Sequence, residues 1–229
     1  MPVALGLALF AGSRRAVRLA LGLTAALLLV FILDDTPREP EIWSSYHKLR
    51  LMRDELIQVN NIGYQAMMRM ARLPGNDALP VDRIDRFNMP YALQRPAGRV
   101  LVVGAGSGND VASAIKAGAT SVTAGEIDPV IYGIGRALHP QHPYGDHRVR
   151  VVIDDARHFL RMSRDEFDVI VFSHLDSHTV LSSYTNVQLD NYIYTVEAFR
   201  EAQARLAPGG LLYVSFLVER PFVGGRVFR

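Results

Sequence analysis

The stretch RVLVVGAGSGND, residues 99–110, most constrains what this chain can fold into. Residues 100–103 form an apolar, mostly β-branched run that is typical of a buried parallel strand. Glycines follow at every second position, and glycine lets the backbone turn tightly against a ligand. A helix start comes directly afterwards. The stretch therefore predicts a ligand-binding turn at the carboxyl end of a parallel strand.

The spacing of the glycines narrows the class of ligand. Gly104, Gly106 and Gly108 read G-x-G-x-G, whereas the nicotinamide dinucleotide fingerprint G-x-G-x-x-G would require glycine in place of Asn109. This spacing favours S-adenosylmethionine-type binding over NAD. The turn is not followed by a Lys-Ser or Lys-Thr pair, so a phosphate-transfer site is not indicated.

The composition limits which kinds of fold, partner and site remain possible for this chain. With 229 residues, 49% of them hydrophobic and 21% charged, the chain can bury the core of one ordinary domain. The net charge is only +2 and basic residues are mixed with acidic ones, so we expect no nucleic-acid partner. The absence of cysteine excludes disulfides, thiolate metal sites and a cysteine nucleophile.

The first 40 residues differ from the rest. Residues 16–33 are almost continuously apolar, apart from Arg18, and approach the length that crosses a bilayer. We expect residues 1–40 to form a membrane anchor and linker. A cleaved signal peptide and a buried helix are the alternatives, but no small-x-small cleavage site precedes Asp34. Residues 2–12 fit the end of an earlier span in a longer parent protein.

The side of the membrane is ambiguous. Arginines precede the apolar run, and Asp34 and Asp35 follow it, which by the positive-inside rule places the next domain outside. An adenosyl cofactor is intracellular, and on that ground we expect the soluble domain to be cytoplasmic.

Residues 41–98 are expected to form a small cap. Patches of alternating hydrophobicity predict short strands with a turn at Asn60 and Asn61, and a helix is expected over residues 80–93, ended or kinked by Pro90. Residues 99–229 then form the main domain.

Strands and helices alternate through the main domain. Helices are predicted over residues 109–117, after Asp128 as cap with Pro129 in first position, over 156–162, and over 190–206, ended by the Pro-Gly-Gly at 208–210. Predicted strands cover residues 100–103, 121–124, 148–153, 167–172 and 211–216. The fold class is thus α/β, a doubly wound, mostly parallel sheet with five strands. A sheet of this kind usually continues with an antiparallel pair, so we expect an incomplete sheet or a fragment of a longer protein.

Acidic residues follow two of these strands. Glu126 follows the second predicted strand, roughly 20 residues after the glycine turn, where a carboxylate can accept both ribose hydroxyls. Asp155 lies just after the third predicted strand and is the candidate acceptor for the adenine amino group. Alternatively, Asp154 or Asp155 caps the helix over residues 156–162.

The polar segment after the fourth strand should face the transferred group. Asp176 is the candidate base for an amine there, with His174 or His178 as alternatives. A metal site made of these three residues is not predicted, because no helix is expected to place both imidazoles on one face.

The ordered motifs resemble one family. RVLVVGAGSGND, EIDP, RVRVVIDDARHFL and FDVIVFSHLDS are similar to successive motifs of spermidine and spermine synthases, a branch of the class I S-adenosylmethionine-dependent methyltransferase fold. LDSHTVLSSYTNVQLDNYIYT also resembles segments of spermidine synthase-like domains embedded in bacterial inner-membrane proteins. The resemblance covers residues 43–216 and implies a Rossmann-like domain.

The resemblance implies a role for individual residues. The three glycines and Ser107 would wrap the nucleoside, Glu126 would hold the ribose, Asp155 would meet adenine, and Gln65 would contact the cofactor from the cap. Two positions depart from the family, because aminopropyltransferases carry aspartate where this chain has Ser107 and Ser173. The next acid of the pattern is kept as Asp176. The candidate catalytic residues are therefore Asp176, Ser173 and His174.

We expect a transferase that moves an alkyl group, aminopropyl by family, from S-adenosylmethionine or its decarboxylated form to an amine-type acceptor. The alternatives are a plain methyltransferase, which the two serines permit, and a non-catalytic nucleoside-binding domain of a membrane protein. A homodimer, or further membrane segments of a longer protein, would fit as partners.

Overall fold

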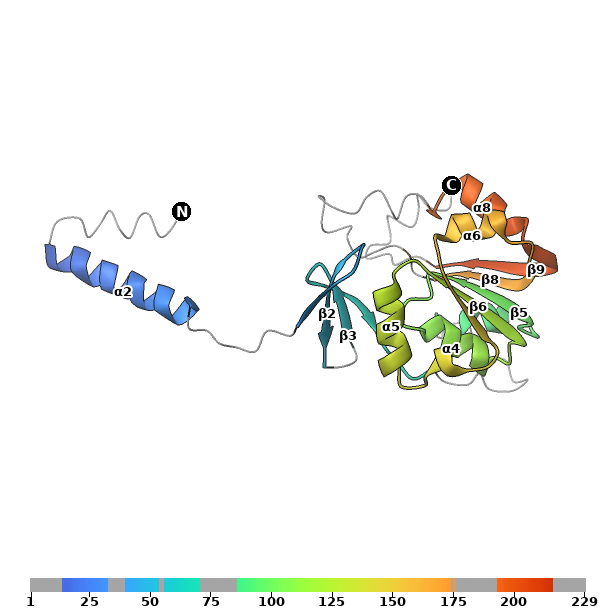
Figure 1. Cartoon of the computed structure of the whole chain (residues 1–229), viewed down its shortest axis with the longest axis horizontal. Helices are drawn as coiled ribbons and strands as arrows, with labels where there is room; N and C mark the ends of the chain where they lie inside the picture. The colour runs from blue at the N-terminus through green and yellow to red at the C-terminus, as the bar shows by residue number, and fades with distance from the viewer. Residues whose placement is uncertain are drawn as a thin grey trace. The chain divides into compact units, whose positions relative to one another are not determined.

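The computed structural model describes residues 14–32, 40–53, 56–70, 86–173, 175 and 193–215. The chain divides into two compact units, Met1–Pro40 and Glu41–Arg229. The cap and the strand-helix repeat thus belong to one unit (Figure 1).

The first unit contains the helix α2, Arg14–Ile32. Among the residues that the structure describes, no helix is both long and apolar enough to cross a membrane. The predicted anchor over residues 16–33 is therefore not supported by the described residues. Arg14, Arg15 and Arg18 stand near the start of α2, and the uncharged remainder, residues 19–32, measures about 21 Å against a hydrocarbon core of about 30 Å.

The second unit begins with an antiparallel sheet of four strands, β1 to β4 in sequential order. They are β1 Glu41–Trp43, β2 Lys48–Met52, β3 Leu56–Val59 and β4 Ile62–Ala66. Asn60 and Asn61 connect β3 to β4 with φ of 51° and 68°, a left-handed conformation that asparagine tolerates. The predicted cap strands and the turn between them are confirmed.

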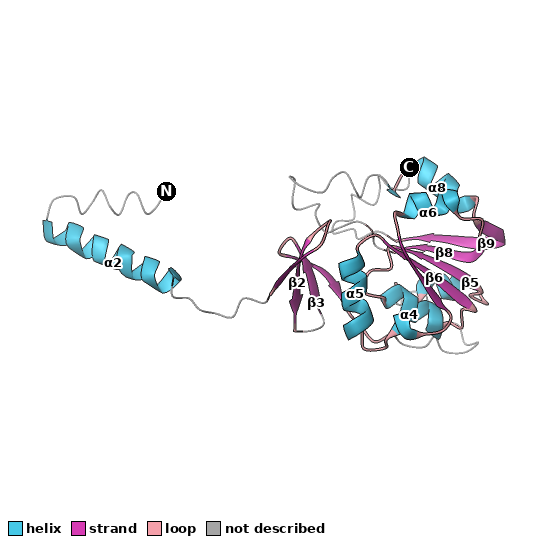
Figure 2. Ribbon diagram, viewed as in Figure 1, coloured by secondary structure: helices cyan, strands magenta, loops and turns pink. Residues whose placement is uncertain are grey.

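A second, five-stranded sheet follows. Its strands are β5 Arg99–Val103, β6 Ser121–Glu126, β7 Val149–Ile153, β8 Phe167–Phe172 and β9 Leu206–Val214. The order is β7-β6-β5-β8-β9, and each neighbouring pair is parallel (Figures 1 and 2). The predicted five-stranded parallel α/β sheet is confirmed. Any strand beyond residue 215 lies outside the described residues.

Alternate residues of β5 point to opposite faces of the sheet and belong to two hydrophobic cores, one on each face. Val100 and Val102 pack with residues of α3 (Met89–Leu93), α4 (Asn109–Lys116) and the short 3-10 turn η2 (Pro143–Gly145). Leu101 and Val103 pack with residues of α6 (Ala156–Met162) and α8 (Val196–Gln203). Figure 2 shows α6 and α8 together on one side of the sheet and α4 on the other.

The cap sheet packs against α5, Pro129–Leu138. Leu49, Ile57 and Val59 of the cap form one buried cluster with Ile131 and Ile134 of this helix. The apolar face of the small sheet is thus covered by the main domain.

Asp128 joins the two parts through hydrogen bonds. Its Oδ1 accepts from Val130 N at 2.9 Å, which confirms it as the N-cap of α5, and its Oδ2 accepts from Ser44 Oγ at 2.6 Å. The cap is therefore tied to the end of β6 at a fully buried carboxylate.

Two predicted helices have different bounds. Within the helix expected over residues 190–206, the structure has α8 from Val196 to Gln203, capped by the Thr195 hydroxyl, which accepts from Ala198 N; residues 190–192 lie outside the described residues. Residues 208–210 do not end this helix but lie inside β9. The pairing of β8 with β9 shifts register there, so Pro-Gly-Gly forms a bulge. Pro90 stands in the first turn of α3, where its missing N–H costs nothing.

Candidate functional site

The glycine loop follows β5 and is fixed by backbone hydrogen bonds. The N–H groups of Gly104 and Ala105 both donate to Gly125 O of β6, each at 2.9 Å. On the other side of the loop, the buried Tyr144 hydroxyl donates to Gly106 O at 2.6 Å. Gly108, with φ of 106°, then starts α4 as its N-cap. The loop is thus a rigid turn and not an open connection.

Glu126 lies beneath this loop at the end of β6. One carboxylate oxygen accepts from Gly106 N at 2.7 Å and the other accepts from Asp128 N at 2.9 Å. Burial raises the pKa of Glu126, and the two backbone hydrogen bonds oppose that shift. Each carboxylate oxygen can accept more than one hydrogen bond, so the group has capacity left for ribose hydroxyls.

Gln65, on β4 of the cap, covers the loop from the opposite side. Its Oε1 accepts from Ser107 N at 2.7 Å. Gly106 has φ of 56°, and a Cβ built on it would lie 2.6 Å from the Gln65 amide. The close approach of the glutamine requires glycine at this position.

Asp155 lies at the next strand end, half-buried. It is the N-cap of α6, and its Oδ1 accepts from His158 N at 2.9 Å. Asp154 lies next to it, pairs with the ring of His158 at 2.6 Å, and donates its backbone N–H to Glu126 O at 3.1 Å. The capping alternative therefore holds for Asp155, and its role toward adenine stays a prediction.

Ser173 follows β8 directly and is 6% exposed. Its N–H donates to Val103 O at 3.1 Å, and its hydroxyl donates to the carboxylate of Asp110 in the first turn of α4. The other two candidate catalytic residues, His174 and Asp176, lie outside the described residues.

The structure thus brings most predicted binding residues to one edge of the parallel sheet. The carboxyl ends of β5, β6 and β8 meet there, as the register of the paired strands shows. The predicted residues found at this edge are Gly104, Gly106, Ser107, Gly108, Glu126, Gln65 and Ser173, with Asp155 at the adjacent end of β7.

Asn109 forms a hydrogen-bond network that the sequence patterns did not predict. The Asn109 amide donates to Ala66 O at 2.8 Å, and its carbonyl oxygen accepts from Met68 N at 3.0 Å, so it binds the segment after β4. The same oxygen lies 3.1 Å from Nε2 of His139. The sequence held a signal for this network, because Asn109 occupies the position where a dinucleotide fingerprint needs glycine.

The tautomer of His139 follows from its neighbours. Gln141 N donates to its Nδ1 at 3.2 Å, so Nε2 carries the hydrogen and donates to Asn109. Full burial lowers the pKa of His139 to about 4. The ring is therefore neutral and structural.

Gly135 of α5 presses on the glycine loop and was also missed. A Cβ built on it would lie 2.3 Å from the backbone oxygen of Ser107. Glycine inside an amphipathic helix costs stability relative to alanine, so its presence at position 135 is a sequence signal that close packing requires a residue without a side chain.

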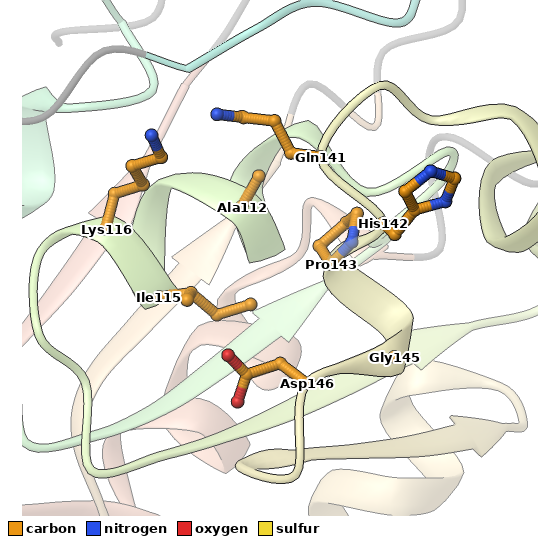
Figure 3. A pocket seen from close by; sticks show the side chains of 8 residues that line it. All are labelled: Ala112, Ile115, Lys116, Gln141, His142, Pro143, Gly145 and Asp146. Atoms are coloured by element: carbon orange, nitrogen blue, oxygen red, sulfur yellow. The ribbon is translucent and has the colours of Figure 1, made fainter.

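A separate pocket of about 270 Å³ lies between α4 and residues 141–146 (Figure 3). Its lining includes Ala112, Lys116 and His142, and it contains none of the predicted site residues. The pocket therefore does not coincide with the strand-end site.

Solved structures share this fold. A spermidine synthase from Thermotoga maritima matches with a TM-score of 0.55 and 18% identity, covering 80% of this chain and 60% of that one. A spermidine synthase in complex with the transition state analogue AdoDATO matches with a TM-score of 0.52 and 18% identity, covering 80% of this chain and 59% of that one. A probable spermidine synthase from Corynebacterium glutamicum matches with a TM-score of 0.51 and 20% identity, covering 78% of this chain and 64% of that one.

A sequence relative is a polyamine aminopropyltransferase of Pectobacterium carotovorum subsp. carotovorum (strain PC1), 34% identical over 88 residues. The match covers 37% of this chain and 31% of that protein, so the chain spans less than two thirds of the length of these relatives.

One family model covers more than half of the chain. It describes the spermine/spermidine synthase domain and matches residues 87–215, which include the glycine loop, Glu126 and Ser173. The five-stranded sheet and the loop that it positions lie within the matched range. The chain belongs to the spermine/spermidine synthase domain family.

Proposed function

We propose that this protein is a spermidine synthase-like transferase that moves an aminopropyl group from decarboxylated S-adenosylmethionine to an amine. The arrangement of Glu126 under the glycine loop carries the proposal, because it presents a buried carboxylate beside a backbone turn, as a nucleoside requires. Membership in the family supports the choice of the aminopropyl group.

The chemistry makes modest demands on the protein. The positive sulfur of the donor makes its attached carbons electrophilic. The lone pair of an unprotonated amine attacks the propyl carbon, the carbon–sulfur bond breaks, and its electrons leave on a neutral thioether, methylthioadenosine. The new ammonium then loses a proton. The protein must orient the two reactants and keep the acceptor unprotonated.

The strand ends supply groups for these tasks. Glu126 would accept the ribose hydroxyls, and Asp155 would accept from the adenine amino group. Gln65 would close the loop over the nucleoside from the cap. Asp176 would take the proton from the amine, with His174 as the alternative. A donor made inside the cell places this domain on the cytoplasmic side, which stays a prediction.

Methyl transfer from S-adenosylmethionine is the second candidate. Serine replaces the aspartates of aminopropyltransferases at Ser107 and Ser173, and methyl donation has no fixed need for those carboxylates. The Ser107 hydroxyl is buried without a hydrogen-bond partner within the described part of the chain.

Mass spectrometry tests the proposed transfer. The full chain is incubated with decarboxylated S-adenosylmethionine and a panel of linear diamines, and we expect methylthioadenosine together with an aminopropylated amine. Glu126→Gln should abolish both products, because its amide N–H₂ would face a backbone N–H. The exposed Asp165→Asn, which also exchanges carboxylate for amide, should leave turnover unchanged. Transfer of a methyl group instead, or no product from the wild type, would refute the proposal.

A further inference from the structure

Two side-chain amides hold the segment that leaves β4 and runs to Met70. The Asn109 amide donates to Ala66 O at 2.8 Å, and its oxygen accepts from Met68 N at 3.0 Å. The Gln141 oxygen accepts from Met70 N at 2.7 Å, and its amide nitrogen donates to Met70 O at 3.1 Å. Each amide thus pairs with an N–H and a C=O of the segment, as a neighbouring strand would.

A buried histidine joins the two amides. The backbone N–H of Gln141 donates to Nδ1 of His139 at 3.2 Å, and Nε2 of the same ring donates to the Asn109 oxygen at 3.1 Å. We call Asn109, His139 and Gln141 the amide clamp. Asn109 begins α4 and the other two residues follow α5, so the main domain supplies the whole clamp. Gln141 lines the separate pocket (Figure 3), which does not coincide with the strand-end site.

The clamp acts at the residue next to Gln65. The Oε1 atom of Gln65 accepts from Ser107 N at 2.7 Å, and two positions further along the chain Asn109 binds Ala66 O. The end of β4 is therefore attached to the glycine loop and the start of α4 through two successive residues. Because a planar peptide bond joins Gln65 to Ala66, a shift of Ala66 also shifts Gln65.

Strand pairing alone fixes Gln65 weakly. β4 is the last strand of the cap sheet, and Gln65 pairs with Ile57 of β3. The next residue of β3, Gln58, pairs with Gly63, so β4 has an extra residue at this point. Such a bulge bends the strand and interrupts the ladder of hydrogen bonds. The orientation of Gln65 therefore depends on contacts outside the cap sheet.

We propose that the amide clamp positions Gln65 against the glycine loop and thereby sets the affinity of the strand-end site for a nucleoside. Asn109 and Gln141 are positioning residues, because they act through Gln65 and not through a contact of their own with the nucleoside. The inference rests on the proposed function, since it requires a nucleoside to bind at the loop.

Calorimetry with methylthioadenosine on the full chain tests the clamp. Gln141→Leu keeps the size of the side chain and removes both hydrogen bonds to Met70, while its backbone N–H can still bind His139. We expect the Kd to rise about threefold to tenfold. Gln58→Leu makes the same exchange on β3 and should bind as the wild type does.

A second variant reaches the clamp from its other end. Asn109→Asp keeps the oxygen that accepts from Met68 N but places a second oxygen against Ala66 O, so it should also raise the Kd at least about threefold. Urea unfolding of each variant gives its folded fraction, so that the affinities compared are those of folded protein.

A double-mutant cycle separates positioning from a merely structural role. In the Gln65→Leu background the bond to Ser107 is already lost, so adding Gln141→Leu should change the Kd by less than about twofold. A structural role would instead lower the free energy of unfolding and leave the affinity of the folded protein unchanged. A direct effect on the loop would weaken binding by the same factor in both backgrounds.

The outcomes separate this inference from the proposed function. Methylthioadenosine binding by the wild type that neither Gln141→Leu nor Asn109→Asp weakens overturns this inference alone. Equal weakening in the wild-type and Gln65→Leu backgrounds also overturns it alone, because the clamp then does not act through Gln65. Failure of the wild type to bind methylthioadenosine overturns the proposed function and the inference together.

Discussion

The side-chain oxygen of Gln65 accepts a hydrogen bond from the backbone N–H of Ser107 at 2.7 Å, across 42 positions of sequence. This bond joins the last strand of the cap to the centre of the glycine loop. The cap therefore forms one wall of the proposed nucleoside site and is not a separate appendage.

Replacing Gln65 should loosen the loop. Gln65→Leu keeps the size of the side chain but leaves the Ser107 N–H without its acceptor, which costs about 1–3 kcal/mol. We expect methylthioadenosine affinity, measured by calorimetry, to fall about tenfold. Gln58→Leu on the neighbouring strand is the control and should bind normally. Equal affinities for the two variants would remove Gln65 from the site.

Gly135 and Gly133 form a matched pair on α5. Alanine is a better helix former than glycine by about 1 kcal/mol, so Gly133→Ala, with no atom within 4 Å of its new Cβ, should stabilise the protein. Gly135→Ala should destabilise it by about 1–3 kcal/mol, because the methyl group meets the Ser107 backbone. Urea unfolding measures both changes. Stabilisation by both substitutions would show that α5 does not press on the loop.

His139 should make the folded state sensitive to acid. Its pKa is lowered from 6.5 to about 4 by burial, so the unfolded chain binds its proton at a higher pH than the folded chain does. Stability from this group is complete above pH 6.5 and is lost as pH falls toward 4, by at most about 3 kcal/mol.

Denaturant unfolding between pH 7 and 4 measures this loss. His139→Gln removes the titrating ring, so the free energy of unfolding should depend less on pH in that interval. The exposed His147→Gln should keep the full dependence. The same pH dependence in wild type and His139→Gln would contradict the buried neutral ring.

The sequence predicts well what depends on local pattern. The apolar run over residues 167–172 coincides with β8, and Asp128 caps α5 as expected. Glu126 could be placed at the site because parallel strands in register bring their carboxyl ends to one edge. These features follow from periodicity and capping chemistry within a few residues.

Features that depend on distant partners could not be predicted in this way. Pro-Gly-Gly at 208–210 reads as a helix stop, but pairing with β8 turns it into a bulge. The hydrogen bond between Ser173 and Asp110, and that between His139 and Asn109, join residues 63 and 30 positions apart. No local pattern marks either pair, since each depends on how α4 packs against the sheet.

Donor preference tests the central claim most directly. Calorimetry on the full chain should show decarboxylated S-adenosylmethionine binding at least about tenfold tighter than S-adenosylmethionine, because a site selective for the aminopropyl donor excludes the extra carboxylate of the latter. Equal affinity for both donors, or binding of S-adenosylmethionine alone, would contradict an aminopropyltransferase and indicate methyl transfer.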